Sequence, residues 1–320
     1  MHASSRLCPL ALIAFAPALG LALARTPAAA SQPQELSSEL RLEGLDTIEV
    51  LVNGVPTRLE VNPSASGPIL INPDIAEKAK LRASDRLTYD FGEYQVPTYV
   101  TNTSLNFGSE PRKRRVTWTK IAASNRADGV IGVQHLPYDR VTFVLGEPSA
   151  SERVQRFPLK RKGRPDFLRI GTDLEVADKK LFAVFALGIE PNLVSASTAN
   201  FLATHQEGGF VEGSENVVEM AAFAMRRPTK DMRLAYPLEL GDLQLDTFAV
   251  RVNDHGKANK VGNIDENDPR FVDGAIVVSR RKGRGKPDVV TRIGRSQIAH
   301  CSRLTFDLAA DVIELSCALK

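Results

Sequence analysis

The chain has 320 residues, with 41 basic and 38 acidic side chains, a formal net charge of +3 and three cysteines. A net charge this small argues against nucleic acid as the main partner, and no glycine-rich phosphate loop is present. The length is enough for two domains of ordinary size or one large β domain.

Residues 1–30 have the pattern of a secretory signal peptide. Arg6 precedes an almost wholly apolar run from Leu7 to Ala24, and small residues offer cleavage sites after Ala24 or Ala30. A membrane anchor is the alternative, because about 18 apolar residues could span a bilayer. The prolines in the run and its alanine-rich end favour processing. We therefore expect an exported protein, periplasmic or secreted, in which residues 31–44 form an N-terminal linker.

Short strands dominate the next hundred residues. Asn53-Gly54 between two apolar runs predicts a β-hairpin. A short helix is predicted over 73–79, with Asn72 as its cap and Pro73 at its first position. The other runs of strand character, separated by polar turns, are 87–107, 116–122, 128–132 and 141–145.

Two pairs of similar segments indicate an internal repeat. Ile131-Gly132, followed by Arg140 to Phe143, matches Ile293-Gly294, followed by Arg303 to Phe306. Likewise, Pro68 to Ala76 matches Pro191 to Ala199, with a capping residue before a helix start in each. Both matches occur in the same order, which predicts two copies of one lobe. The boundary is expected in the polar, proline-containing stretch from Glu147 to Pro165.

The segment Val61-Asn62-Pro63-Ser64-Ala65-Ser66-Gly67, together with Asp128-Gly129-Val130-Ile131-Gly132, resembles the retropepsin and pepsin group of aspartic peptidases. Within that group the chain is most similar to bacterial exported proteins with both lobes in one chain. The resemblance implies a mostly β fold whose two lobes are closed β-barrels with short helices. It places lobe 1 at 45–147, an inter-lobe linker at 148–166, and lobe 2 at 167–320 with a basic insertion at 253–292.

In that family each lobe gives one aspartate to a shared catalytic pair. Two carboxyls about 3 Å apart share a proton, so that one acts as a base and the other as an acid. Here Asn62 stands at the first position, and an amide has no proton to exchange at ordinary pH. Pro63 also prevents the usual cyclisation that converts asparagine to aspartate. In the second lobe the alignment places Phe185 at the acid position, so both aspartates are expected to be lost.

The resemblance leads to three hypotheses about function. In the first, the chain is a pseudo-peptidase that binds an extended polypeptide as an added strand in an inter-lobe cleft. Asn62, Ser64, Ser66 and Phe185 would line this cleft, under a flap near 96–106. In the second, it is an active aspartic-type endopeptidase whose missing acid comes from a loop or a partner chain. In the third, it is a structural envelope protein with a closed cleft, which burial of Asn62 under side chains would favour.

Cys301 and Cys317 flank two alternating runs joined at Ala309 to Asp311, which predicts a hairpin with the cysteines nearly opposite each other. An oxidising compartment would allow them to form a disulfide; two buried free thiols are the alternative.

The remaining motifs are less specific. The histidines His135, His205, His255 and His300 lack metal-ligand spacing, and we expect neither metal nor cofactor. Basic runs at 112–115, 160–164 and 280–286 are interpreted as solvated loops that could contact an anionic envelope surface. We expect a monomer.

Overall fold

The computed structural model describes residues 38–90, 95–220, 222–252 and 290–318. The predicted signal peptide, the tip of the flap hairpin and most of the basic insertion lie outside these residues. No helix in the described ranges is long and apolar enough to cross a membrane. The described chain is mostly β, as predicted. It also contains the helices and 3-10 turns α1 (Pro73–Lys78), α2 (Ala196–His205), η1 (Val133–His135), η2 (Pro165–Phe167) and η4 (Arg295–Ile298).

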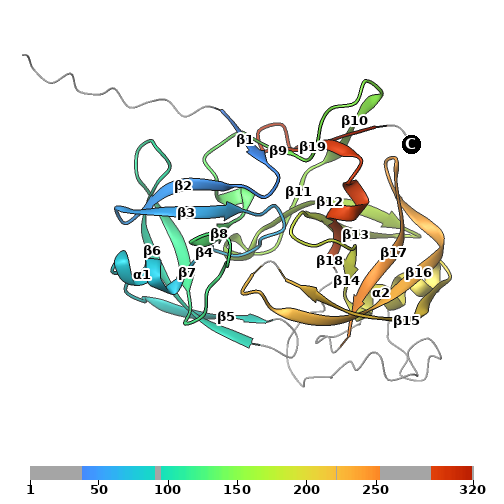
Figure 1. Ribbon diagram of the computed structural model, residues 1–320, viewed down its shortest axis with the longest axis horizontal. Helices are drawn as coiled ribbons and strands as arrows, with labels where there is room; N and C mark the ends of the chain where they lie inside the picture. Colours follow the sequence, from blue (N-terminus) through green and yellow to red (C-terminus); the bar gives the residue numbers. More distant parts are fainter. Residues whose placement is uncertain (1–37, 91–94, 221, 253–289, 319–320) are drawn as a thin grey trace, which may run out of the picture. The chain divides into compact units, whose positions relative to one another are not determined.

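The first sheet closes into a barrel. Its strands, in hydrogen-bonding order, are β2 (Thr47–Val52), β3 (Val55–Val61), β8 (Gly129–Ile131), β4 (Ile69–Ile71), β7 (Arg112–Trp118), β6 (Gln95–Asn106) and β5 (Asp85–Asp90). An additional antiparallel pairing joins β2 to β6, so every strand except the edge strand β5 belongs to a closed ring (Figure 1). The predicted hairpin is present, and Asn53 and Gly54 have the positive φ values, 48° and 83°, that a type I′ turn requires.

The second sheet repeats the centre of the first. Its order is β11 (Lys160–Lys162), β12 (Arg169–Val176), β13 (Lys179–Ala186), β18 (Val290–Gly294), β14 (Leu193–Val194), β17 (Leu243–Arg251), β16 (Arg226–Leu240) and β15 (Gly208–Glu219). β13 runs parallel to β18, β18 antiparallel to β14, and β14 parallel to β17, as β3, β8, β4 and β7 do in the first sheet. A second closed barrel was expected, but over the described residues no pairing closes this sheet, because β11 and β15 each pair with a single neighbour.

A third sheet combines strands from distant parts of the chain. Its order is β1 (Glu39–Glu43), β9 (Arg140–Val144), β19 (Cys301–Asp307), β20 (Val312–Ala318) and β10 (Glu152–Pro158). β1 and β10 are edge strands, although they lie in the two segments that the sequence suggested were linkers. Each pairs along its whole length, β1 with β9 and β10 with β20.

The predicted cysteine hairpin is confirmed. β19 and β20 are antiparallel, and their register sets Cys301 opposite Cys317. The two residues form a disulfide. The turn between the strands includes Asp311, whose φ of 56° lies in the left-handed region.

Helix α1 begins as predicted but is capped differently. Pro73 occupies its first turn and Asp74 places a carboxyl near its N-terminus, where the helix dipole favours negative charge. The side chain of Asn72 makes no cap hydrogen bond. Its amide instead accepts from the backbone N–H groups of Ala123 and Ser124 and donates to the carbonyl oxygens of Ser124 and Ala127. Asn72 therefore anchors the loop before β8.

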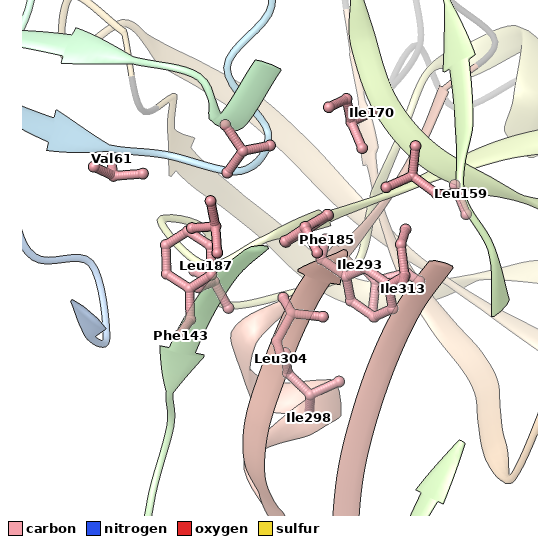
Figure 2. Close-up of a cluster of buried hydrophobic side chains, with 14 of the residues drawn as sticks. Val61, Phe143, Leu159, Ile170, Phe185, Leu187, Ile293, Ile298, Leu304 and Ile313 are labelled. Carbon is pink, nitrogen blue, oxygen red and sulfur yellow. The ribbon is translucent and has the colours of Figure 1, made fainter. Parts of the chain in front are cut away.

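One hydrophobic core joins the three sheets. Val61 from β3, Phe143 from β9, Phe185 from β13 and Leu304 from β19 belong to the same buried cluster. Figure 2 shows these side chains together with Leu187 and Ile293. The chain segments on either side of the candidate site are thus fixed by shared apolar burial, the main favourable contribution to folding.

Candidate functional site

The turn that carries Asn62 begins where β3 ends. The Asn62 backbone N–H donates to the Ile131 carbonyl of β8, and the Ala65 N–H donates to the Asn62 carbonyl, which closes the turn. Gly67 has a φ of +106°, and a Cβ there would lie 2.7 Å from the Tyr89 hydroxyl oxygen. The turn therefore needs glycine at this position, both for the backbone conformation and for space.

Residues of η1 hold the turn from the other side. The Gln134 side-chain amide donates to the Ala65 carbonyl at 3.1 Å. The Nε2 of His135 lies 2.7 Å from the Gly67 carbonyl oxygen, a distance at which the Nε2–H tautomer donates. These bonds give His135 a structural role in the turn, consistent with its lack of metal-ligand spacing.

The side chain of Asn62 is fully buried, at 0 % exposure. Its Oδ1 accepts from the Ser64 backbone N–H at 3.0 Å and from the Ser64 hydroxyl at 2.8 Å. Because Oδ1 faces a backbone N–H, the amide nitrogen points the other way, and Nδ2 donates to Glu60 Oε1 at 3.4 Å. Asn62 thus bridges strand and turn through hydrogen bonds and has no ionisable proton.

Glu60 is the site residue that the sequence analysis missed. Its residue exposure is 4 %, although it is charged and lies in a strand. Besides Asn62, its carboxyl contacts the Ser124 hydroxyl at 3.5 Å and Arg126 Nε at 3.8 Å. The period-two alternation of β3 puts Arg58 and Glu60 on one face, next to Asn62, but Arg58 is exposed, so the alternation alone does not show that Glu60 is buried.

A pocket of about 180 Å³ opens beside Glu60. Its lining comes from two parts of the chain that are far apart in the sequence: Leu45, Glu60, Ser124, Asn125, Arg126, Gly188, Glu219, Met220 and Ala224. Another pocket, of about 480 Å³, lies over β2 and β3 and includes Asp128. Neither pocket is lined by the four residues proposed from the sequence, so the hollow near the turn is formed by Glu60 and its neighbours.

The tip of the β15–β16 hairpin packs beside the turn. Phe223 is 6 % exposed and shares a small apolar cluster with Leu70, Val96, Ala123 and Val130, against which Ala65 of the turn also packs. Its backbone N–H donates to the Ala123 carbonyl at 3.0 Å. Phe223 and Ala224 have positive φ values of 60° and 46°. The tip therefore keeps an unfavourable backbone conformation that its contacts must offset.

Tyr89 links this cluster to the neighbouring strands. Its ring contacts those of Phe223 and Phe167 edge to face, with centroids 5.6 and 5.8 Å away. Burial raises the pKa of Tyr89 to about 12, and a hydrogen bond with the Thr117 side chain offsets a smaller part of this rise. The phenol is therefore protonated throughout the physiological range.

The residues proposed from the sequence lie in different environments. Ser64 and Ser66 are partly exposed, whereas Phe185 is 1 % exposed within the main core. Val61 is paired with Ile131 and Phe185 with Ile293, at corresponding points of the two parallel ladders. By this register Ala186, one residue beyond Phe185, corresponds to Asn62. Residues 96–106, proposed as the flap, form most of β6, and Val96 contributes to the cluster around Phe223.

The other candidate side chains have structural partners. The Phe201 ring lies 4.4 Å from that of His205, and His255 lies outside the described residues. In the described ranges, the one group arranged to hold a metal ion is His300 with Cys301 and Cys317. Because the two sulfurs are bonded to each other, they are not available as the thiolates that bind metals.

The basic runs differ from the expected loops. Residues 112–115 form the start of β7 and pair with β6, so their side chains alternate between the two faces of a strand. Lys160 to Lys162 form the exposed strand β11. The run at 280–286 lies outside the described residues.

Comparisons with known proteins give weak structural similarities. No protein-family model matches the chain, and no curated protein matches it. Among solved structures, it is similar to EIAV protease complexed with the inhibitor HBY-793, with 19% identity over 29% of this chain and 86% of that chain and a TM-score of 0.23. It is also similar to a retropepsin-like aspartic protease from Rickettsia conorii, with 14% identity over 39% of this chain and 87% of that chain and a TM-score of 0.23. Both neighbours are aspartic proteases, but similarities this weak do not show a family for this chain.

Proposed function

We propose that this protein is an exported, catalytically inactive protein of aspartic-peptidase-like architecture that binds an extended polypeptide without cutting it. Inactivity is supported by the two corresponding turn positions, which hold an amide at Asn62 and a methyl group at Ala186. Neither side chain ionises at ordinary pH, so neither can act as the general acid or base that the paired carboxyls of aspartic peptidases provide. Export rests on the pattern of residues 1–30, and the disulfide is compatible with it.

The observation that carries the binding proposal is the outer edge of β15, which pairs with no other strand of the described chain. This strand of 12 residues is the outermost of its sheet, and within the described chain it pairs with β16 alone. An exposed edge presents unpaired backbone groups to which an extended peptide can add as a further strand. Val211 and Val217 on this strand are exposed apolar side chains. Their exposure supports a surface that contacts another chain.

The register of β15 identifies a backbone group that a bound peptide would use. Val217 lies opposite Pro228, which has no N–H, so these two residues form a non-hydrogen-bonded pair. The Val217 N–H therefore points away from β16, toward the free edge. In this structure it donates to Asn216 Oδ1 at 2.7 Å. The side chain of the preceding residue, Asn216, thus occupies the Val217 N–H, which an incoming strand would otherwise use as a donor.

The edge strand also leads to the pocket beside Glu60. Its last residue, Glu219, is one of the pocket residues, as are Met220 and Ala224 of the hairpin tip. A peptide that pairs along β15 could therefore place a side chain in this pocket. Binding at β15 differs from the cleft expected from the sequence, in which the turn itself was the contact surface.

The test is peptide retention by immobilised protein from which residues 1–30 have been removed. Val217→Pro removes the outward N–H and keeps all the backbone hydrogen bonds between β15 and β16. Val217→Thr keeps that N–H and is the matched control. We expect Val217→Pro to retain about tenfold less of an unbiased peptide mixture than Val217→Thr. This factor corresponds to the loss of about one hydrogen bond and of the packing next to it. Equal retention by both variants would contradict binding at this edge.

The same incubation tests the alternative of an active aspartic-type endopeptidase. Peptides would be read by mass spectrometry from about pH 3 to 7, with Asn62→Ala beside the wild type. Our proposal predicts that peptides are recovered intact. Cleavage that Asn62→Ala abolishes would support a peptidase. Such an enzyme would need a second carboxyl, because Glu60 has hydrogen bonds or ion pairs with Asn62, Ser124 and Arg126 and with no other acid among the described residues.

A structural envelope role is the second candidate. The complete burial of Asn62 and the packing of Phe223 beside the turn favour it, since both limit access to the position of the first acid. This role predicts that wild-type protein retains no peptide and cleaves none. Retention at β15 would separate the two functions, because the edge strand lies outside the buried turn.

A further inference from the structure

Among the described residues, Glu60 is a buried acid without a close charged partner. Its side chain is 6 % exposed, and its three contacts, at 3.4, 3.5 and 3.8 Å, all lie at or beyond the upper limit of useful hydrogen bonds. Burial of a carboxylate is costly unless strong hydrogen bonds or an opposite charge compensate for the lost water. The contacts with described residues therefore leave much of the binding capacity of this carboxyl unused.

The nearby arginine does not supply that compensation. Arg126 is 63 % exposed at its side chain, and its terminal nitrogen donates to the Leu45 carbonyl at 3.2 Å. The guanidinium is thus held at the edge of the pocket by a backbone oxygen. Its Nε reaches the carboxyl of Glu60 only at 3.8 Å.

The charges that line the pocket favour a positively charged group. Glu60 and Glu219 contribute two carboxyls, and Arg126 contributes the one basic side chain of the lining. Met220 and Ala224 provide apolar wall, against which the methylene chain of a lysine or arginine can pack while its charged end reaches an acid. An anionic group would instead have to approach two carboxyls, which like-charge repulsion opposes.

We infer that this pocket receives a lysine or arginine side chain of the bound polypeptide and that the Glu60 carboxyl pairs with its charge. The inference rests on the proposed function, because it assigns a preference to peptides that bind along β15. An ammonium or guanidinium group that reached Glu60 at ordinary ion-pair distance would form a charge-assisted hydrogen bond, about twice as strong as a neutral one.

Small probes test the pocket independently of peptide binding. The probes are N-acetyl-lysine methylamide and its uncharged analogue N-acetyl-norleucine methylamide, with binding followed by chemical shifts of the pocket residues. We expect the lysine probe to bind at least about tenfold more tightly than the norleucine probe, and Glu60→Gln to remove that difference. Glu77→Gln, at an exposed position of helix α1 outside the pocket and outside β15, should leave it unchanged.

A peptide experiment separates the failure of this inference from the failure of the proposed function. Two peptide pools, identical except for lysine or norleucine at one central position, are passed over the wild type, Glu60→Gln and Glu219→Gln. Preferential retention of the lysine pool that Glu60→Gln abolishes supports the inference. Equal retention of both pools keeps peptide binding and overturns the role of Glu60.

Absence of retention for both pools overturns peptide binding itself. The lysine probe still decides about the pocket in that case: shifts that depend on Glu60 support a cation site, and no shifts overturn it. Glu219→Gln is the second variant, for the case that Glu60→Gln fails to fold. Glu219 is exposed at the rim of the pocket, so its substitution removes a charge without disturbing buried contacts. We expect it to weaken lysine binding about twofold to threefold, as a partly screened charge does.

Discussion

The two corresponding turns of the molecule have the same strand arrangement and opposite chemistry. After β3 the chain continues with Asn62, whose amide bonds to Ser64 and Glu60 beside a polar pocket. The corresponding residue is Ala186, the last residue of β13, which packs with Ile189, Leu193, Val218 and Ala249. Val218 belongs to the edge strand β15. One turn therefore makes buried polar contacts, while the other provides apolar support for the proposed binding strand.

The helix starts that follow these turns differ in the same way. Asn72 and Ser195 both have extended backbone conformations before a helix. Ser195 accepts from the Thr198 N–H at 3.1 Å, as a helix cap does. Asn72 leaves its helix uncapped and anchors the loop that carries Ser124 and Arg126. The first lobe thus uses its polar side chains to position the pocket, and the second uses them for local stability.

The largest expected effect is that of Phe185→Ala, which tests whether Phe185 is a core residue or a binding residue. Phe185→Ala would leave a cavity in the cluster of Figure 2, and we expect it to lower the free energy of unfolding by about 3–5 kcal/mol. Denaturant unfolding measures this loss. A variant of unchanged stability that has lost peptide retention would contradict the burial of this ring.

A comparison of Asn72→Ala with Ser195→Ala sharpens the difference between the two helix starts. Loss of the Asn72 amide leaves backbone groups of the 123–127 loop without partners, so we expect a cost of about 3 kcal/mol. Loss of a cap costs about 1 kcal/mol. Thermal or denaturant unfolding of both variants gives the comparison. A larger loss at Ser195 would show that the loop anchor is unimportant.

Asn62→Asp tests the polar turn through its pH dependence. The new carboxyl would face that of Glu60 at the 3.4 Å position of the present amide contact. Two adjacent carboxyls share a proton, so the pKa of the introduced aspartate is raised above its unfolded value of about 3.9. A raised folded pKa means that the variant's stability is retained at low pH and lost as pH rises through that folded value.

We expect Asn62→Asp to be about 2 kcal/mol less stable than wild type at pH 7 and to approach wild type near pH 4. Unfolding curves at a series of pH values provide the measurement. Asn62→Ala is the control, because it removes the same hydrogen bonds without adding a charge and should lose stability equally at both pH values. A pH-independent loss for the aspartate variant would mean that its carboxyl does not meet Glu60.

The smallest effect concerns the hairpin tip that packs beside the first turn. Ala224 has a φ of 46°, a conformation that costs residues with a Cβ about 1 kcal/mol and glycine much less. Ala224→Gly should therefore stabilise the protein by up to about 1 kcal/mol. A melting temperature that falls instead would indicate that the alanine methyl group contributes more through packing than its backbone strain costs.

Local patterns predicted much of the fold. The Asn53-Gly54 hairpin, the helix after Pro73 and the opposed cysteines follow from short-range rules, and the strand pairings repeat in the order that the matched segments predict. The strands β1 and β10 were missed because their pairing partners lie far away in the sequence. An alignment of helix starts also cannot fix a strand register, which is why Phe185 was placed one residue away from the position that corresponds to Asn62.

The candidate site was less predictable. Motif resemblance drew attention to the acid position and its serines, whereas the pocket is formed by Glu60, which lies outside the motif, and by the hairpin tip, which is more than 150 residues away in the chain. A charged residue within a strand ordinarily indicates a solvent-facing side chain. Only tertiary packing, with the 123–127 loop on one side and Met220 and Ala224 on the other, buries Glu60.

The most direct test of the central claim is hydrogen–deuterium exchange of β15 in the presence and absence of retained peptide, with the peptide recovered and weighed afterwards. If β15 binds peptide without cutting it, segments that contain the outward N–H of Val217 exchange more slowly and the recovered peptides have unchanged mass. Unchanged exchange across Gly208–Glu219, accompanied by cleaved peptide, would contradict it.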